Sequence, residues 1–216
     1  MAGLGLAAMD EPRMDEPGTK RALRRAAIAR RKEVPAADRT AAGTMVARHA
    51  RALFDGLEAG ATVAAYVPMG SEIRIEPLLE NALARGLRLL VPMLGTGMEV
   101  GWGVLETLDD LAVAGDGHGR PEEPAEAETL GMEALRDAAV VIVPALAVDA
   151  SGTRLGRGGG WYDRALAHVS PDAPLVAVCW PWEMLPDGAD PLPREPHDLP
   201  VDGVVTPEGL TMFGKE

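Results

Sequence analysis

A run of glycines crowded by charged and aromatic side chains is the stretch of this sequence best suited to chemistry. Residues 154–164 read Arg-Leu-Gly-Arg-Gly-Gly-Gly-Trp-Tyr-Asp-Arg. This stretch follows an apolar run, 139–148, and precedes a helix-like run, 162–169, so we expect a strand, a turn and a helix to meet there. Backbone N–H groups of such a turn can converge on an anion. Arg154 and Arg157 add planar donors that match phosphate oxygens.

The stretch therefore predicts a phosphate site. The spacing of its glycines excludes the two commonest kinds of phosphate-binding motif. A P-loop would end in Gly-Lys-Ser/Thr, and a dinucleotide fold would show Gly-x-Gly-x-x-Gly. Neither pattern is present, which indicates a less common nucleotide site. The alternative is a flexible glycine turn with solvated arginines.

Positive charge is concentrated near the start of the chain. Residues 20–32 hold seven of the 21 Lys and Arg residues, in a protein whose net charge is −12. Thr19 suits a helix N-cap, and Val34-Pro35 stops the helix. Lys20 and Arg24 are four residues apart, so they share a face of the helix. That face is either a solvated surface or part of an anion site.

The apolar runs predict an α/β domain with a mainly parallel sheet. A strand at 61–68, a helix at 76–85 and a strand at 87–92 form one parallel crossover unit. Ligands in such sheets bind beyond the carboxyl ends of the strands. Glu72 follows the first of these strands, where it either meets a ligand or remains an ordinary loop acid. Further helices are expected at 36–57 and 162–169, and further strands at 98–104, 139–143, 175–180 and near 204–206.

Composition bounds the protein class. We expect a disordered tail over 1–18 and a single domain over 19–216, with a core mainly of Ala, Val and Leu because aromatic residues make up only 4%. The net charge of −12 argues against nucleic-acid binding. Cys179 is the only cysteine, which fits a reducing cytoplasm, and we read it as a small hydrophobe.

No apolar run is long enough to span a membrane, and the first residues do not resemble a secretory signal. We expect a cytoplasmic monomer that acts on small molecules.

Four separated motifs resemble the 5-formyltetrahydrofolate cyclo-ligase family, also called 5,10-methenyltetrahydrofolate synthetase. The family's Arg-x-Gly-x-Gly-x-Gly-Tyr-Tyr-Asp signature matches residues 154–163, with Trp161 in place of the first Tyr. Three weaker motifs are a Lys-x-x-x-Arg pair at 20–24, Tyr-x-Pro-x-x-x-Glu-Ile at 66–73, and His-Asp-x-x-Val-Asp-x-Val-Val-Thr at 197–206.

The resemblance implies a three-layer α/β/α fold similar to the sugar-isomerase and CoA-transferase group. It implies ATP-dependent closure of 5-formyltetrahydrofolate to 5,10-methenyltetrahydrofolate, with Mg²⁺ as cofactor and reduced folate and ATP as the small-molecule partners. Catalysis would rest on Arg157 and Lys20. ATP would contact Lys20, Arg24, Arg154, Gly156, Arg157, Gly158, Gly159, Gly160, Trp161 and Tyr162. Val67 and Glu72 would bind the folate, and Asp163 and Asp202 would hold Mg²⁺.

Several alternatives stay open. Asp163 could cap a helix and Asp202 could serve a turn. Met93 and Trp102 could line a pterin cleft or simply pack in the core. His118 is expected to be exposed, and His197-Asp198 to be a structural pair.

Two other functions also remain possible. The family commonly has Thr shortly after the glutamate, where this chain has Arg74-Ile75. That departure leaves room for a paralogue that binds nucleotide or folate without catalysis. An ATP-dependent enzyme acting on another small acid is the third possibility.

Overall fold

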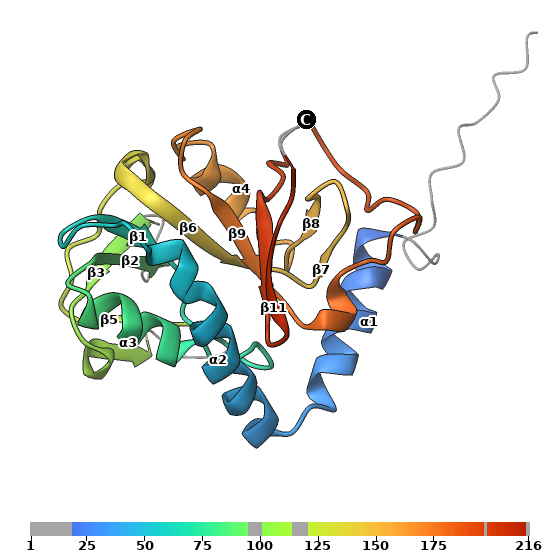
Figure 1. The fold of residues 1–216 in the computed structure, drawn as a ribbon, viewed down its shortest axis with the longest axis horizontal. Helices are drawn as coiled ribbons and strands as arrows, with labels where there is room; N and C mark the ends of the chain where they lie inside the picture. Colours follow the sequence, from blue (N-terminus) through green and yellow to red (C-terminus); the bar gives the residue numbers. More distant parts are fainter. Residues whose placement is uncertain (1–18, 95–100, 114–120, 197, 215–216) are drawn as a thin grey trace, which may run out of the picture.

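A central sheet of seven strands organises the protein. The computed structural model describes residues 19–94, 101–113, 121–196 and 198–214. Predictions for residues 1–18, 98–100, His118 and His197 lie outside this part of the chain. The sheet has the order β11-β10-β9-β6-β1-β2-β3 (Figure 1). Its strands are β1 (Thr62–Ala64), β2 (Arg88–Met93), β3 (Gly101–Leu105), β6 (Ala138–Pro144), β9 (Leu175–Val178), β10 (Gly203–Thr206) and β11 (Gly209–Met212).

Five of these strands, β10, β9, β6, β1 and β2, run parallel to one another, and the two edge strands are antiparallel. Strand β6 shows why such strands read as continuous apolar runs. Val140 and Ile142 belong to one hydrophobic core, whereas Val141 and Val143 belong to another. Because successive side chains point to opposite faces, a strand buried on both faces must be apolar throughout.

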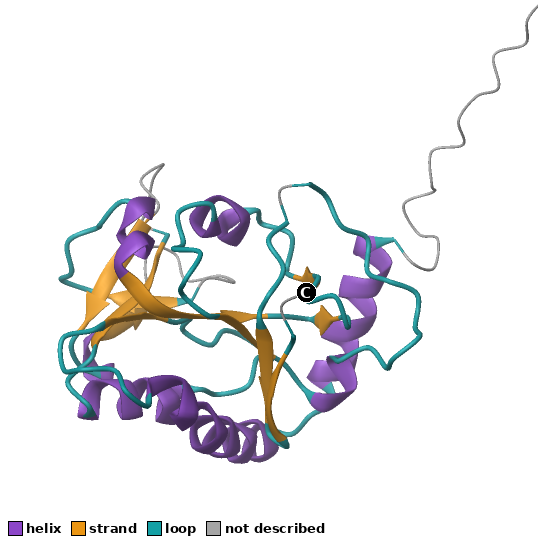
Figure 2. Cartoon of the chain, turned by 45° about the horizontal axis from the view of Figure 1, so that its top comes forward, coloured by secondary structure: helices purple, strands orange, loops and turns teal. Residues whose placement is uncertain are grey.

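Helices cover both faces of the sheet, as Figure 2 shows. Helices α2 (Ala36–Ala50) and α3 (Glu76–Ala84) pack in the core on one face. Helix α4 (Trp161–Leu166) and the 3-10 helix η3 (Met132–Asp137) pack in the core on the other. The predicted three-layer α/β fold with a mainly parallel sheet is confirmed.

Helix α1 (Lys20–Lys32) stands beside the sheet layers, next to a small hairpin of β7 (Ala147–Val148) and β8 (Arg154–Leu155) (Figure 1). The side chain of Thr19 accepts a hydrogen bond from the Ala22 amide, which confirms the predicted N-cap. A third cluster joins Leu23 and Ile28 of the helix to Leu155 of the hairpin. The helix is therefore held against the start of the glycine-rich segment.

Some elements differ from the predictions. Helix α2 ends at Ala50 and continues as a 3-10 helix, η1 (Arg51–Phe54). Helix α4 ends at Leu166 because His168 and Val169 donate to carbonyls three residues back, which tightens the chain beyond it. The β7–β8 hairpin, strand β11, and the pair β4 (Leu111–Val113) and β5 (Glu122–Pro124) were not predicted. Within the described residues, no helix has the length and apolar character needed to cross a membrane.

Candidate active site

A cavity of about 440 Å³ opens at the carboxyl ends of the parallel strands. Its walls include residues just past β1 and β2, the end of β6, helix α1 and the glycine-rich segment. All predicted site residues except Asp202 line this cavity: Lys20, Arg24, Val67, Glu72, Arg154, Gly156, Arg157, Gly158, Gly159, Gly160, Trp161, Tyr162 and Asp163. The structure therefore brings the basic helix, the loop after β1 and the glycine-rich segment to one space.

The glycine-rich segment needs glycine at two of its positions. Gly158 and Gly160 have φ values of +91° and +65°, in the left-handed region that other residues rarely adopt. A side chain at Gly158 would also meet the guanidinium of Arg24, whose Nε donates to the Gly156 carbonyl at 2.8 Å. The turn therefore lies against helix α1, and the Arg24 side chain links the two.

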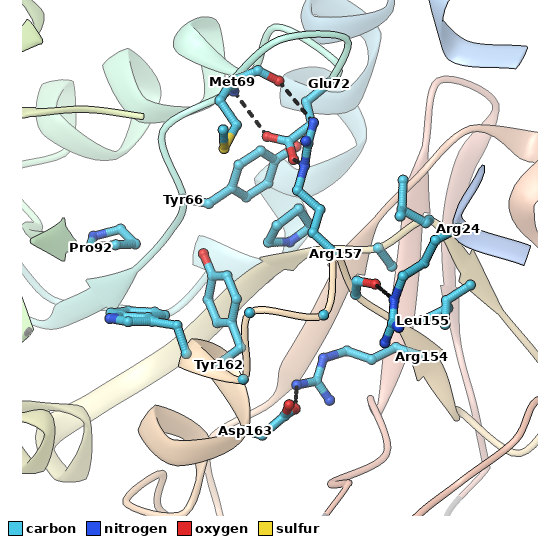
Figure 3. Close-up of a pocket in the computed structure, with 18 of the residues that line it drawn as sticks. Arg24, Tyr66, Met69, Glu72, Pro92, Arg154, Leu155, Arg157, Tyr162 and Asp163 are labelled. Carbon is cyan, nitrogen blue, oxygen red and sulfur yellow. Dashed lines mark hydrogen bonds and ion pairs between the residues drawn. The ribbon is translucent and has the colours of Figure 1, made fainter. Parts of the chain in front are cut away.

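Arg157 and Glu72 form an ion pair inside the cavity (Figure 3). Arg157 Nε donates to Glu72 Oε1 at 2.9 Å, and Arg157 Nη2 donates to the Met69 carbonyl at 3.4 Å. Glu72 Oε2 accepts the Met69 amide at 3.0 Å. The Glu72 side chain is only 4% exposed, whereas that of Arg157 is 36% exposed. The residue predicted for phosphate and the one predicted for folate therefore contact each other directly.

Two further cations of the cavity, Arg154 and Lys20, also have acidic partners. Arg154 Nη2 donates to Asp163 at 2.9 Å, and its Nη1 donates to the Leu199 carbonyl at 2.9 Å. Lys20 pairs with Asp198 at 2.9 Å and with Glu195 at 3.0 Å. Burial lowers the pKa of Lys20, but its hydrogen bonds to the two acids outweigh that effect and leave the pKa raised. Any anion that enters must compete with these local acids.

Two tyrosines supply neutral hydroxyl groups. Burial, reinforced by the negative charge of Glu72, raises the pKa of Tyr66 and of Tyr162 well above the usual value. Both phenols therefore keep their protons at neutral pH and can donate hydrogen bonds. Trp161 packs edge-on against the Tyr162 ring, with centroids 4.7 Å apart, and so fixes its position.

Asp202 lies apart from this cavity. Its carboxylate accepts the Leu175 amide at 2.9 Å, at the amino end of β9, whereas the cavity lies at the carboxyl ends of the strands. Asp198, which the sequence reading treated as structural, does line the cavity. Arg154 connects Asp163 to the carbonyl of the residue that follows Asp198. Within the described part of the chain, no group of three or more His, Cys, Asp or Glu side chains could hold a metal ion without other ligands.

Sequence reasoning also missed Arg31, which lines the cavity. Its guanidinium is buried and donates two hydrogen bonds of 2.6 Å to Glu183 and a third to the Ala145 carbonyl. Burial lowers the pKa of Arg31, but the Glu183 carboxylate outweighs this effect and raises it. Arg31 lies seven positions after Arg24, which places both on one face of the helix, and this spacing could have marked it.

Comparison with known proteins identifies the family. The model of the 5-formyltetrahydrofolate cyclo-ligase family matches residues 16–207. The chain belongs to the 5-formyltetrahydrofolate cyclo-ligase family. A 5-formyltetrahydrofolate cyclo-ligase of Mycolicibacterium smegmatis is 40% identical over 199 residues, which cover 89% of this chain and 95% of that protein.

Solved cyclo-ligase relatives share the fold. The structure of 5,10-methenyltetrahydrofolate synthetase from Aquifex aeolicus superposes with a TM-score of 0.73 at 27% identity, covering 91% of this chain and 94% of the other. The Mycoplasma pneumoniae synthetase has a TM-score of 0.63 at 18% identity, covering 88% and 99% of the two chains. At that identity the second match supports the fold alone.

The departure from the cyclo-ligase pattern at Arg74-Ile75 does not reach the cavity. Arg74 pairs with Glu76 at 2.5 Å, Ile75 is fully buried, and neither lines the cavity. Met93 and Trp102 do not line it either. Trp102 is 1% exposed and packs against Trp161 in the core, so these two residues follow the packing alternative.

Proposed function

We propose that this protein converts 5-formyltetrahydrofolate to 5,10-methenyltetrahydrofolate while ATP becomes ADP and phosphate. The observation that carries this proposal is the contact between Arg157 of the glycine-rich segment and Glu72 of the loop after β1. The contact supports the proposal because it joins the residue expected to bind phosphate to the residue expected to bind folate. Both line one cavity of a chain that belongs to the cyclo-ligase family.

We assign the two ends of the cavity to the two substrates. Lys20, Arg24, Arg154 and the backbone of 156–160 offer cations and N–H donors suited to phosphates. Val67, Glu72 and Tyr66, with the apolar surfaces of Pro92 and Leu94, suit the pterin ring. In this assignment Glu72 accepts hydrogen bonds from the amino-substituted edge of the pterin.

The chemical difficulty of the reaction is that a formyl oxygen leaves poorly. The formyl oxygen attacks the γ-phosphorus of ATP, the bond to the β-phosphate oxygen breaks, and ADP departs. N10 then attacks the activated formyl carbon and loses its proton, and the carbon–oxygen bond breaks to release phosphate. In this proposal Arg157 stabilises charge on the transferred phosphoryl group, and Lys20 and Arg24 hold the remaining phosphates.

Asp163 and Asp198 fit a magnesium ion carried by ATP. Mg²⁺ needs only one or two carboxylates beside phosphate and water, and both acids line the cavity near the proposed phosphates. We propose this pair in place of Asp163 with Asp202, since Asp202 does not line it. When bound, the ion neutralises phosphate charge and orients the triphosphate.

A direct assay tests the proposal. The protein is mixed with Mg-ATP and 5-formyltetrahydrofolate, and methenyltetrahydrofolate is followed by its absorbance. We expect one ADP per product formed. Binding of folate without conversion would favour the inactive paralogue, and ATP use only with another acid would favour the third function. We also propose that the active form is a monomer.

A further inference from the structure

A second hollow, of about 360 Å³, adjoins the active-site cavity. It is lined by Ile28 and Lys32 from the last turns of α1, Arg39 from the first turn of α2, Gly70 and Ser71 from the loop after β1, and Arg157. Arg157 is the only described residue that lines both spaces. Its guanidinium therefore forms the boundary between them.

The walls of this hollow are fixed by backbone contacts. The Arg74 amide donates to the Arg39 carbonyl at 3.3 Å, which ties the loop to α2. Arg39 Nη1 donates to the Val34 carbonyl at 2.7 Å, which holds its side chain across the turn between α1 and α2. Gly43 lies so close to the loop that a side chain there would overlap the Arg74 carbonyl. These contacts fix the segments that surround Lys32 and Arg39.

The hollow is positively charged in an acidic protein. Among the residues that the structure describes, no carboxylate pairs with Lys32 or Arg39, and none lines the hollow. The cations of the main cavity, by contrast, mostly have acidic partners there. With a net charge of −12 over the whole chain, two uncompensated cations that line one hollow favour an anionic ligand at this place.

The position of the hollow indicates which anion it takes. In the proposed reaction N10 must lie beside the phosphorylated formyl group, and hence beside Arg157. N10 also carries the aminobenzoyl-glutamate part of the folate, so this tail starts at Arg157 and ends in two carboxylates. Arg157 lines both the cavity and the second hollow, so a tail that leaves the cavity at Arg157 enters this hollow.

We propose that Lys32 and Arg39 bind the carboxylates of the substrate's glutamate tail, with the Ser71 hydroxyl as a neutral donor. This inference rests on the proposed function, because it takes 5-formyltetrahydrofolate as the substrate. The subsite sets affinity for the tail and leaves the chemical step to the first cavity. Additional glutamates on the tail would bring more negative charge to the same cations.

Steady-state kinetics on two substrates tests the subsite. Lys32 is exposed, so Lys32→Ala and Lys32→Glu should fold normally, which thermal denaturation checks. We expect Lys32→Ala to raise the KM for 5-formyltetrahydrofolate about three- to fivefold, the scale of one partly exposed charge pair, and Lys32→Glu to raise it further. The KM for 5-formyltetrahydropteroate, which keeps N10 but lacks the glutamate, should change less than about twofold, and kcat should stay constant for both substrates.

Arg51→Ala provides a matched control, because Arg51 is exposed and lines neither space. It should leave every constant unchanged. An unchanged KM in both Lys32 variants, an equal rise for the two folates, or a rise in the KM for ATP instead would overturn the subsite. Absence of any turnover by the unaltered protein would instead refute the proposed function, so the two failures are distinguishable.

Discussion

Arg157 belongs to both functional halves of the cavity, and it is the residue on which catalysis should depend most. Its charge is matched by Glu72, which is almost fully buried. When ATP binds, the same guanidinium must also face the transferred phosphoryl group. A charge donor in this position acts mainly on the transition state.

We expect Arg157→Ala to lower kcat at least about a hundredfold, the usual scale for losing a donor to a developing charge. The measurement of kcat is the rate at which methenyltetrahydrofolate forms at saturating concentrations of both substrates. Arg157→Lys keeps the charge but not the planar fork, so it should recover part of the activity. Near-normal turnover in the alanine variant would remove Arg157 from this role.

The residue types of the cavity could be predicted from sequence, but their pairings could not. Arg154–Asp163 and the glycine positions are local in the chain. Arg157 and Glu72, however, are 85 positions apart, and Arg24 and Gly156 are 132 apart. No spacing rule relates such positions, because the sheet decides which strand ends meet. For the same reason Asp198, and not Asp202, turned out to line the cavity.

At the scale of elements, helix α1 is attached by a small apolar cluster and by one buried ion pair. The side chains of Arg31 and Glu183 are each 2% exposed, and Glu183 also accepts the Trp180 amide at 2.9 Å. Removing one partner would leave the other charge buried without compensation. The attachment of α1 matters for function because Lys20 and Arg24 come from the same helix.

We expect Arg31→Met to lower the free energy of unfolding by about 3–5 kcal/mol, the range for breaking a buried pair on one side. Urea denaturation measures this. Arg48→Met, at an exposed position of α2, is the control and should change stability by less than about 0.5 kcal/mol. Equal stabilities of the two variants would show that the pair does not hold the helix.

The contact between α2 and the loop that carries Glu72 should be equally sensitive to substitution. We expect Gly43→Ala to push this loop away from the helix, because the added methyl group would overlap the Arg74 backbone. Overpacking of this kind costs about 1–3 kcal/mol, and it should also raise the KM for the folate. Gly209→Ala meets no atom within 4 Å and serves as the control. A wild-type KM and melting temperature for Gly43→Ala would contradict the expected displacement.

Long apolar strands and capped helices were predictable because burial on both faces and capping leave local signals. The two-residue strands of the β7–β8 hairpin leave no periodicity to detect. Strand β11 is partly exposed along its length and pairs only at the sheet edge, so it lacks an apolar run.

At the scale of the whole molecule, the protein's two tyrosines report on folding at high pH. The chain contains only Tyr66 and Tyr162, and burial raises the pKa of both. An unfolded tyrosine titrates near pH 10. Since the folded state holds these protons more tightly, stability should be complete below about pH 10 and decrease as the pH rises above it.

We therefore expect the ultraviolet absorbance of tyrosinate to stay flat through about pH 10 in the folded protein. Both groups should then ionise together with the loss of circular dichroism. In urea the same titration should return to an ordinary curve near pH 10. Ionisation of either tyrosine near pH 10 without unfolding would contradict the burial of its hydroxyl.

Cys179 follows directly after β9, an interior strand of the sheet, and is fully buried. Burial raises the pKa of its thiol, so the reactive thiolate is scarce as well as shielded. Because the chain has no other cysteine, a thiol-selective alkylating reagent can modify the protein only when the sheet opens beside β9. The rate of alkylation therefore measures how often the sheet opens there, without any engineered probe.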